Sequence, residues 1–319
     1  MNRKDIEKYF CNILQKEEDV SAGIAAIRTL LEIIKNDRSS TVQELDENLK
    51  VGIDVMRNTN YPITAINSGC ELFLRFITFA KLDRNSIEDC KVIMLNRGLL
   101  FLKKLNEARA KIVKLAGQFI VDGSQILTHS RSRVVLQTLK EAAKQKKRFH
   151  VYATISAPDD SGYNSLINFC CLCITVYVCS ERIANELQRA GIACTLILDS
   201  AVGYVMEKVD FIMVGAEGVV ESGGIINKIG TYTIGLCAKE MKKPLYVLTE
   251  SFKFTRLYPL SQGDLPDEYK YTKNMRNKDL KAQHPLVDYT PPTYITLLFT
   301  DLGILTPSAV SDELINLYL

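Results

Sequence analysis

The sequence predicts an α/β protein with a helical N-terminal part and a mainly parallel sheet in its C-terminal part. Up to about residue 120, apolar residues recur at helical spacing, whereas beyond residue 121 short apolar runs alternate with helical periods. Such alternation is typical of βαβ units. The 319 residues suffice for two domains with a sizeable core. We therefore expect a helical domain over residues 1–120 and an α/β domain over residues 121–319.

The N-terminal helices are predicted from apolar residues spaced three and four positions apart. Breaks between helices are expected at residues 36–41, 58–62 and 81–86, where Asn, Ser, Pro and charged residues cluster. The residues that set the helical period are Ile24, Ile27, Leu30, Leu31, Ile34, Leu72, Phe73, Phe76, Phe79, Leu99, Leu102, Leu105 and Ile112.

The C-terminal part is expected to alternate strands and helices in chain order. The predicted strands are residues 125–128, 149–155, 193–198, 211–214 and 245–248. The predicted helices are residues 134–146, 183–190, 202–208 and 225–241. Beyond them we expect an extended loop over residues 257–292, a further strand over 294–299 and a tail, 301–319, that ends in an amphipathic turn.

Polar residues follow several of these strands at the point where each strand ends. They are His129-Ser130, Asp199-Ser200, residues 215–217 and Glu250-Ser251. The carboxyl ends of parallel strands meet at one edge of a sheet, and ligands of open α/β sheets bind beyond that edge. The sequence therefore predicts a ligand site there.

Residues 209–235 carry a glycine-rich segment between a predicted strand and a predicted helix. Glycines let the backbone approach a ligand, N–H groups at a helix start point toward an anion, and Lys228 adds positive charge. The segment contains neither G-x-x-x-x-G-K-[ST] nor G-x-G-x-x-G, the common nucleotide-binding patterns. Two interpretations remain open: a phosphate site, or an ordinary tight turn.

The composition argues against several classes of function. A formal net charge of +3 leaves no excess to drive direct binding to nucleic acid or to a membrane surface. Three histidines, and nine cysteines without paired C-x-x-C motifs, argue against a metal site. The charged N-terminus lacks a signal core, no apolar run is long enough for a membrane helix, and the scattered cysteines fit a reduced cytosolic protein.

One apolar stretch, residues 166–179, does not fit the alternation. It contains Cys170, Cys171, Cys173 and Cys179, and it is too short to span a bilayer. We expect a buried strand or strand pair there rather than a metal site.

Five segments together resemble a known family. Residues 68–76 (SGCELFLRF), 126–136, 214–231, 250–254 (ESFKF) and 297–319 resemble the regulatory alpha, beta and delta subunits of eukaryotic translation initiation factor 2B, and the last segment resembles the alpha branch. That family is similar to isomerases acting on methylthioribose-1-phosphate and ribose-1,5-bisphosphate. The resemblance covers nearly the whole chain, and it implies a helical regulatory domain followed by a Rossmann-like domain that carries a ligand pocket and a dimer interface.

The resemblance also indicates the residues of that pocket. Asn227 and Lys228 match a substrate-contacting pair of the isomerases. The ligand would be a sugar phosphate or a nucleoside monophosphate acting as an effector, with no cofactor required and no metal. The candidate ligand-binding residues are His129, Ser130, Arg133, Glu217, Gly223, Gly224, Asn227 and Lys228.

At three places the chain departs from the isomerase pattern. Ser130 stands where the isomerases carry a Cys after Thr-His, and Glu217 stands where they carry a catalytic Asp after Gly-Ala. Residues 157–162 lack the Arg and Gln of their substrate loop. A hydroxyl is far less acidic than a thiol, and a carboxylate moved by one methylene is misplaced for catalysis. We therefore expect no catalytic residues; an isomerase that uses Glu217 as acid and base is the alternative.

By resemblance, the chain would be a regulatory subunit of the guanine-nucleotide exchange factor for initiation factor 2. It would form a homodimer in the cytosol, bridge two assemblies of beta, gamma, delta and epsilon subunits, and mediate inhibition by the phosphorylated alpha subunit of initiation factor 2 during stress. Residues 163–180 have no counterpart in related alpha subunits, so they are either a lineage-specific loop or the product of a faulty gene model.

Overall fold

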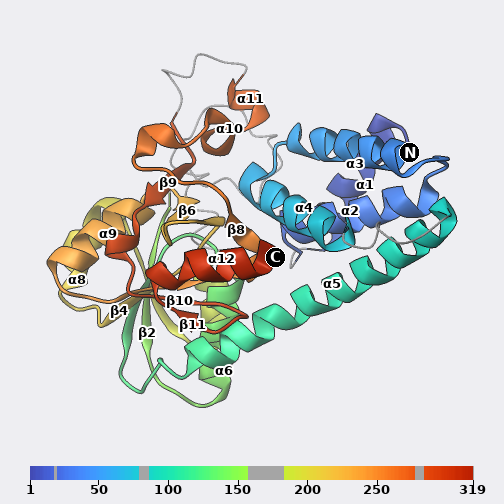
Figure 1. The fold of residues 1–319 in the computed structure, drawn as a ribbon. Helices are drawn as coiled ribbons and strands as arrows, with labels where there is room; N and C mark the ends of the chain where they lie inside the picture. Colours follow the sequence, from blue (N-terminus) through green and yellow to red (C-terminus); the bar gives the residue numbers. More distant parts are fainter. Residues whose placement is uncertain (18–19, 79–85, 157–182, 277–283, 319) are drawn as a thin grey trace, which may run out of the picture.

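The computed structural model describes residues 1–17, 20–78, 86–156, 183–276 and 284–318. A block of helices stands beside an α/β part, and the long helix α5 runs from the one to the other (Figure 1). The apolar stretch 166–179, the insertion 163–180 and most of the break expected at residues 81–86 lie outside the described residues.

The helical block contains α1 (Arg3–Lys16), α2 (Ala22–Asn36), α3 (Val42–Arg57), α4 (Ile63–Thr78) and α5 (Ile87–Gly117). The first three helices begin at side chains that accept a backbone N–H, which is the usual way to satisfy the free donors of a helix start. These caps are Asn2, Ser21 and Thr41. The expected breaks at 36–41 and 58–62 are confirmed.

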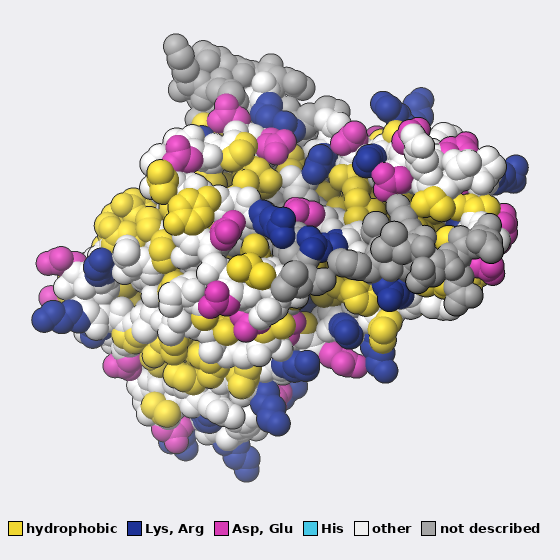
Figure 2. Space-filling model, in the orientation of Figure 1, with side chains coloured by type: hydrophobic (Ala, Val, Ile, Leu, Met, Phe, Trp, Pro, Cys, Tyr) yellow, Lys and Arg dark blue, Asp and Glu magenta, His cyan; other side chains and the backbone are white. Residues whose placement is uncertain are grey.

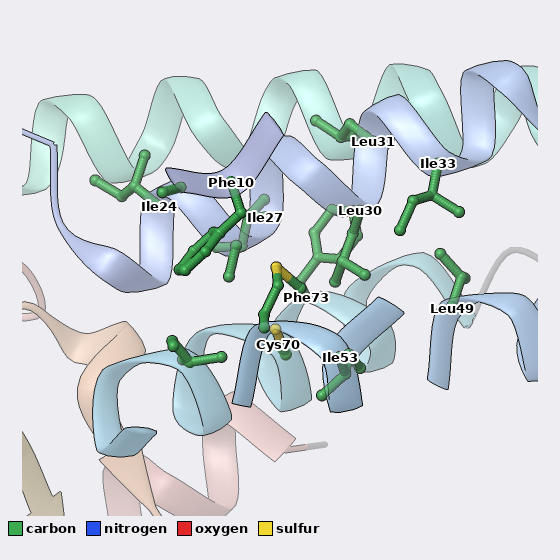
Figure 3. Close-up of a cluster of buried hydrophobic side chains, with 14 of the residues drawn as sticks. Phe10, Ile24, Ile27, Leu30, Leu31, Ile33, Leu49, Ile53, Cys70 and Phe73 are labelled. Carbon is green, nitrogen blue, oxygen red and sulfur yellow. The ribbon is translucent and has the colours of Figure 1, made fainter. Parts of the chain in front are cut away.

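Helix α2 lies at the centre of this block and packs against the other four helices. Figure 3 shows Leu30 and Ile33 pointing toward α4 and α3, and Ile27 and Leu30 are fully buried. Helices α2 and α4 cross closely, as shown by the position of Gly69: a Cβ added there would lie only 3.2 Å from the Cα of Gly23. Glycine at both positions lets the two backbones approach.

The core of the helical block is completed by a residue from the α/β part. Phe252, in the segment after β7, is 0% exposed and belongs to the apolar cluster of α1–α5. Its ring lies so near α2 that a Cβ on Gly23 would come within 2.8 Å of Phe252 Cε2. The two parts of the chain therefore share buried apolar surface.

The α/β part contains a seven-stranded sheet in the order β11-β10-β7-β4-β1-β2-β3. Neighbouring strands are parallel except β10 and β11, so the predicted fold class is confirmed. The strands are β1 (Gln125–Thr128), β2 (His150–Thr154), β3 (Ala193–Ile197), β4 (Phe211–Gly215), β7 (Leu245–Leu248), β10 (Leu297–Phe299) and β11 (Ile304–Leu305). Helices α6 (Arg133–Lys144), 183–189, α8 (Val202–Met206), α9 (Thr231–Glu240) and α12 (Val310–Tyr318) accompany them.

A second sheet corrects two sequence predictions. It has the order β8-β5-β6-β9, with β5 (Gly218–Val220), β6 (Ile225–Lys228), β8 (Phe254–Thr255) and β9 (Val287–Thr290). The helix predicted over residues 225–241 was wrong over its first six residues, because Gly223 closes a β5–β6 hairpin and α9 begins only after Gly230.

The loop predicted over residues 257–292 was also wrong in part. It contains α10 (Asp267–Lys270), α11 (Lys273–Arg276) and the buried strand β9. The prolines and charges of this segment obscured the short strand signal of residues 287–290. The tail ends in a full helix, α12, with Val310 and Leu314 buried.

Replacing Phe252 by Ala should destabilise the protein because the ring fills the helical core. We expect a loss of about 3–5 kcal/mol in the free energy of unfolding, measured by urea denaturation. Leu260→Ala is the control, since Leu260 is 79% exposed and its truncation should change stability by less than ~0.5 kcal/mol. Equal stability of the two variants would contradict the shared core.

Candidate functional site

The candidate site lies where the strand order of the main sheet reverses. From β1 the chain adds β2 and β3 on one side, and it then crosses to β4, which pairs with β1 on the other side. The crevice between the carboxyl ends of two such strands is where ligands of doubly wound sheets bind. His129 and Ser130 follow β1, and Glu217 follows β4, so these three sequence-predicted residues lie at this crevice.

The turn after β1 packs directly against the end of β4. Ser132 accepts a hydrogen bond from the N–H of Val135 at 3.4 Å and so caps α6, which starts at Arg133. A Cβ on Gly215 would lie 2.5 Å from Ser132 Oγ, so only glycine fits at this position. The half-buried Arg133 therefore starts its helix at the same crevice.

His129 is fully enclosed and ties three segments together. Its Nε2 lies 2.9 Å from the carbonyl of Ile229, and its Nδ1 lies 2.6 Å from Thr154 Oγ1. A carbonyl only accepts, so Nε2 carries a proton. Nδ1 also lies 3.2 Å from Ser156 Oγ and 3.7 Å from Asp199 Oδ1. Gly230 leaves room for the ring, since a Cβ there would lie 3.0 Å from His129 Cε1. Both ring nitrogens are thus engaged within the protein.

Backbone strain concentrates at the ends of β1 and β2. Ser130 and Ser156 have φ of +56° and +59°, a left-handed conformation that costs a non-glycine residue about 1–2 kcal/mol. The N–H of Ser130 donates to Ser156 Oγ at 2.7 Å, and the N–H of Ser156 donates to Asp199 Oδ1 at 3.1 Å. Strain held by its surroundings is common at functional sites.

Glu217 and Lys228 form the charged part of the site. They flank the β5–β6 hairpin at its open end, with Glu217 Oε1 and Lys228 Nζ 3.2 Å apart and each side chain 16% exposed. Asn227 donates to Thr231 Oγ1 at 3.1 Å, and the Thr231 hydroxyl donates to the carbonyl of Lys228 at 2.6 Å. The Asn227 amide therefore ties β6 to the start of α9.

Gly223 and Gly224 lie at the closed end of the same hairpin, away from Glu217 and Lys228. A Cβ on Gly223 would lie 2.1 Å from the carbonyl oxygen of Pro307, and one on Gly224 would lie 2.6 Å from the ring of Tyr289. The structure accounts for both glycines by close packing and does not bring them together with the other sequence-predicted site residues.

Asp288 occupies the helix start at which the sequence predicted an external anion. Its Oδ2 accepts from the N–H groups of Gly230 at 2.7 Å and Tyr232 at 3.0 Å. Burial raises the pKa of Asp288 to about 7, and the backbone N–H bonds offset this only in part. Sequence reasoning missed Asp288 because it lies in the segment predicted as a loop.

A second charged cluster lies beside the first. Glu250, after β7, is 3% exposed at its side chain, and its carboxylate faces Lys253 Nζ at 2.8 Å and the Arg109 guanidinium of α5 at 3.4 Å. Burial alone would raise the pKa of Glu250, but Lys253 and Arg109 together lower it to about 2. Lys253 also donates to the carbonyl of Ala216 at 2.9 Å. Sequence reasoning missed Arg109 because it sits within a long amphipathic helix.

Among the described residues, no cluster of His, Cys, Asp and Glu is arranged to hold a metal ion, and no helix is long and apolar enough to cross a membrane. On the face drawn in Figure 2, positive and negative side chains are interspersed.

Comparison with known proteins identifies relatives along the whole chain. The family model described as "Initiation factor 2 subunit family" matches residues 15–307. Translation initiation factor eIF2B subunit alpha of Dictyostelium discoideum is 42% identical, covering 97% of this chain and 95% of its own. The subunit of the same name from Caenorhabditis elegans is 39% identical over 100% of both chains. Ribose 1,5-bisphosphate isomerase of Archaeoglobus fulgidus is 28% identical over 86% of this chain and 82% of its own.

Solved structures share the fold. The translation initiation factor eIF-2B structure from Pyrococcus horikoshii has a TM-score of 0.65 at 25% identity, covering 89% of this chain and 90% of its own. A chain of the tetrameric eIF2B-beta2-delta2 complex from C. thermophilum has a TM-score of 0.75 at 18% identity, covering 100% of this chain and 96% of its own.

The raised pKa of Asp288 predicts a specific pH dependence of stability. The folded protein binds the proton of the Asp288 carboxyl more tightly than the unfolded chain does. Protonation of Asp288 therefore stabilises the folded state fully below about pH 4, and this stabilisation is lost as pH rises toward about 7. Asp288→Asn cannot titrate. The free energy of unfolding of the wild type minus that of the variant should therefore fall between pH 4.5 and pH 8, by on the order of 1 kcal/mol per pH unit at most.

Urea denaturation at a series of pH values measures this difference. All other titrating groups are common to the wild type and the variant, so their contributions cancel. A difference that stays constant over the range would contradict the assignment.

Proposed function

The chain belongs to the initiation factor 2 subunit family, and on that premise we propose that it is a non-catalytic regulatory subunit of the guanine-nucleotide exchange factor for initiation factor 2. The observation that carries this proposal is the near full-length similarity to two relatives named eIF2B subunit alpha. The partners are a second copy of the chain, the beta, gamma, delta and epsilon subunits, and the phosphorylated alpha subunit of initiation factor 2, all in the cytosol.

The two parts of the chain divide this work. The helical domain, residues 1–120, contacts the phosphorylated partner. The Rossmann-like domain, residues 121–319, carries the dimer interface and the ligand pocket. Full-length resemblance to the family supports this division.

The hydrogen bonds of the strand-end residues support the absence of catalysis. A serine nucleophile needs an adjacent base. His129 is the neighbour of Ser130 in the chain, but its ring nitrogens face Ile229 on one side and Thr154, Ser156 and Asp199 on the other. Glu217, which stands where the isomerases carry a catalytic Asp, lies in an ion pair with Lys228. Both groups are thus engaged within the protein, which supports a site without catalysis.

The pocket is proposed to keep an anionic effector, a sugar phosphate or a nucleoside monophosphate. Asp288 already caps α9 and Ser132 already caps α6, so the positive charge for a phosphate comes from side chains. Lys228, the last residue of β6, and Arg133, the first residue of α6, supply it. Charge-assisted bonds of this kind suit phosphate oxygens.

A sugar-phosphate isomerase is the second candidate, and the 28% identity to ribose 1,5-bisphosphate isomerase favours it. Purified protein incubated with ribose-1,5-bisphosphate or methylthioribose-1-phosphate separates the two functions. Steady product formation that is lost in Glu217→Ala would establish the isomerase and overturn the regulatory proposal.

Native mass spectrometry with the candidate partner subunits tests the proposal directly. We expect one assembly that contains two copies of this chain and two copies of each of the other four subunits. Nucleotide exchange by that assembly should be inhibited by the phosphorylated alpha subunit of initiation factor 2, and omission of this chain should relieve the inhibition. Failure to co-assemble, or inhibition that does not depend on this chain, would contradict the proposal.

Lys228→Ala should weaken the binding of a phosphate-bearing effector, because it removes a charge-assisted bond. We expect a loss of about 1–3 kcal/mol, or roughly 5- to 150-fold in Kd, by calorimetry. Lys50→Ala is the control, since Lys50 forms an exposed pair with Asp46 in the helical block. Equal affinities of both variants and the wild type would remove Lys228 from the site.

A further inference from the structure

The two charged clusters at the sheet edge are connected through one lysine. Lys253 Nζ lies 2.8 Å from Glu250 Oε2 and donates at 2.9 Å to the carbonyl of Ala216. Ala216 immediately precedes Glu217, whose carboxylate lies 3.2 Å from Lys228 Nζ. Lys253 therefore joins the cluster of α5 and β7 to the loop that carries the pocket carboxylate.

Glu250 is shared unequally between its two cations. The contact with Lys253 is 2.8 Å, within the usual range for a charge-assisted pair, whereas Arg109 Nε and Nη2 both lie 3.4 Å from Glu250 Oε1. The Glu250 side chain is 3% exposed, so water contributes little to the stabilisation of its negative charge. Any loosening of Lys253 must be offset by a tighter approach of Arg109.

Arg109 belongs to a helix that touches both parts of the protein. Helix α5 is 31 residues long and packs against α2 and α4 in the helical block and against α6 beside the main sheet. A displacement of the Arg109 side chain is thereby passed to a rigid element that borders both domains.

We propose that Lys253 is a relay that couples occupancy of the Glu217–Lys228 pocket to the position of α5. An anion at Lys228 competes with Glu217 for the ammonium group, and the released carboxylate then attracts Lys253, which is held one residue away. Glu250 then loses its 2.8 Å contact with Lys253 and moves closer to Arg109, and this shift changes the position of α5. The relay rests on the anion pocket proposed above.

The relay has two arrangements that an anion distinguishes. In one, Lys228 pairs with Glu217, and Lys253 and Arg109 share Glu250. In the other, Lys228 holds the anion and Arg109 alone faces Glu250. A ligand shifts such an equilibrium only by its differential affinity for the two states, and the anion has this because it replaces Glu217 at Lys228. By linkage, a partner that displaces α5 changes the affinity of the pocket for the anion by the same factor.

Hydrogen exchange of the full-length protein, with and without inorganic phosphate, tests the relay, and calorimetry measures phosphate binding on the same samples. In the wild type we expect phosphate to change the exchange rate of α5 amides around Arg109 by about 5-fold or more. Lys253→Met keeps the length of the side chain but removes the ammonium group, so phosphate should still bind while the α5 response is lost. Lys243→Met is the matched control, because Lys243 Nζ donates to the carbonyl of Glu207, which belongs to neither charged cluster, and its α5 response should equal that of the wild type.

A second variant guards against the loss of Lys253 unfolding the protein. The pair Glu250→Gln with Lys253→Met removes both buried charges together, and it should also bind phosphate without an α5 response. Binding in the wild type without any change at α5 would overturn the relay and leave the pocket intact. Absence of binding would overturn both, and an α5 response that persists in the two Lys253 variants would overturn the relay alone.

Discussion

The buried charge of Glu250 is the constraint on which the joint between the two parts of the molecule depends. A carboxylate this enclosed stays ionised only because Lys253 and Arg109 face it, and removal of either cation would leave a charge that burial strongly disfavours. Arg109 comes from α5, so the requirement fixes the helical block against the end of β7. The same short segment sends Phe252 into the helical core and Lys253 to the carbonyl of Ala216. One run of residues thereby positions the helices, the sheet edge and the loop of the candidate site.

The candidate site is held mainly by bonds within the protein. His129 links the ends of two strands to the start of α9, and Asp288 satisfies the free N–H groups of that helix. Both side chains are engaged in hydrogen bonds that join neighbouring segments. Lys228 lies beside the carboxylate of Glu217, and Arg133 is the first residue of α6 at the same crevice. The proposed role as an anion site needs no more than this, since holding a phosphate requires donors and charge but no proton acceptor.

Local sequence patterns predicted the elements whose stability is local or uniform. Residues 125–128 (QILT) and 245–248 (LYVL) have apolar centres and are mostly buried, and both are strands with those bounds. The second sheet could not be predicted in the same way, because β6 pairs with β9, far along the chain, and residues 225–228 carry a helical period as well as a strand pattern. The capping role of Asp288 follows from that pairing and was hidden with it. The helical spacing around Arg109 predicted its helix but could not predict the buried carboxylate opposite it.

The insertion of Phe252 between α2 and α4 has a consequence for synthesis of the chain. The helices that line this slot leave the ribosome long before residue 252 does. At a synthesis rate of about 5–20 residues per second, roughly 10 s or more pass before Phe252 is available, and in this time the helices' own side chains do not fill the apolar groove. The apolar core of the nascent helical block is therefore incomplete until a later segment of the chain supplies Phe252. Binding by a chaperone, or premature association of two such blocks, would occur in this interval rather than after release of the finished protein.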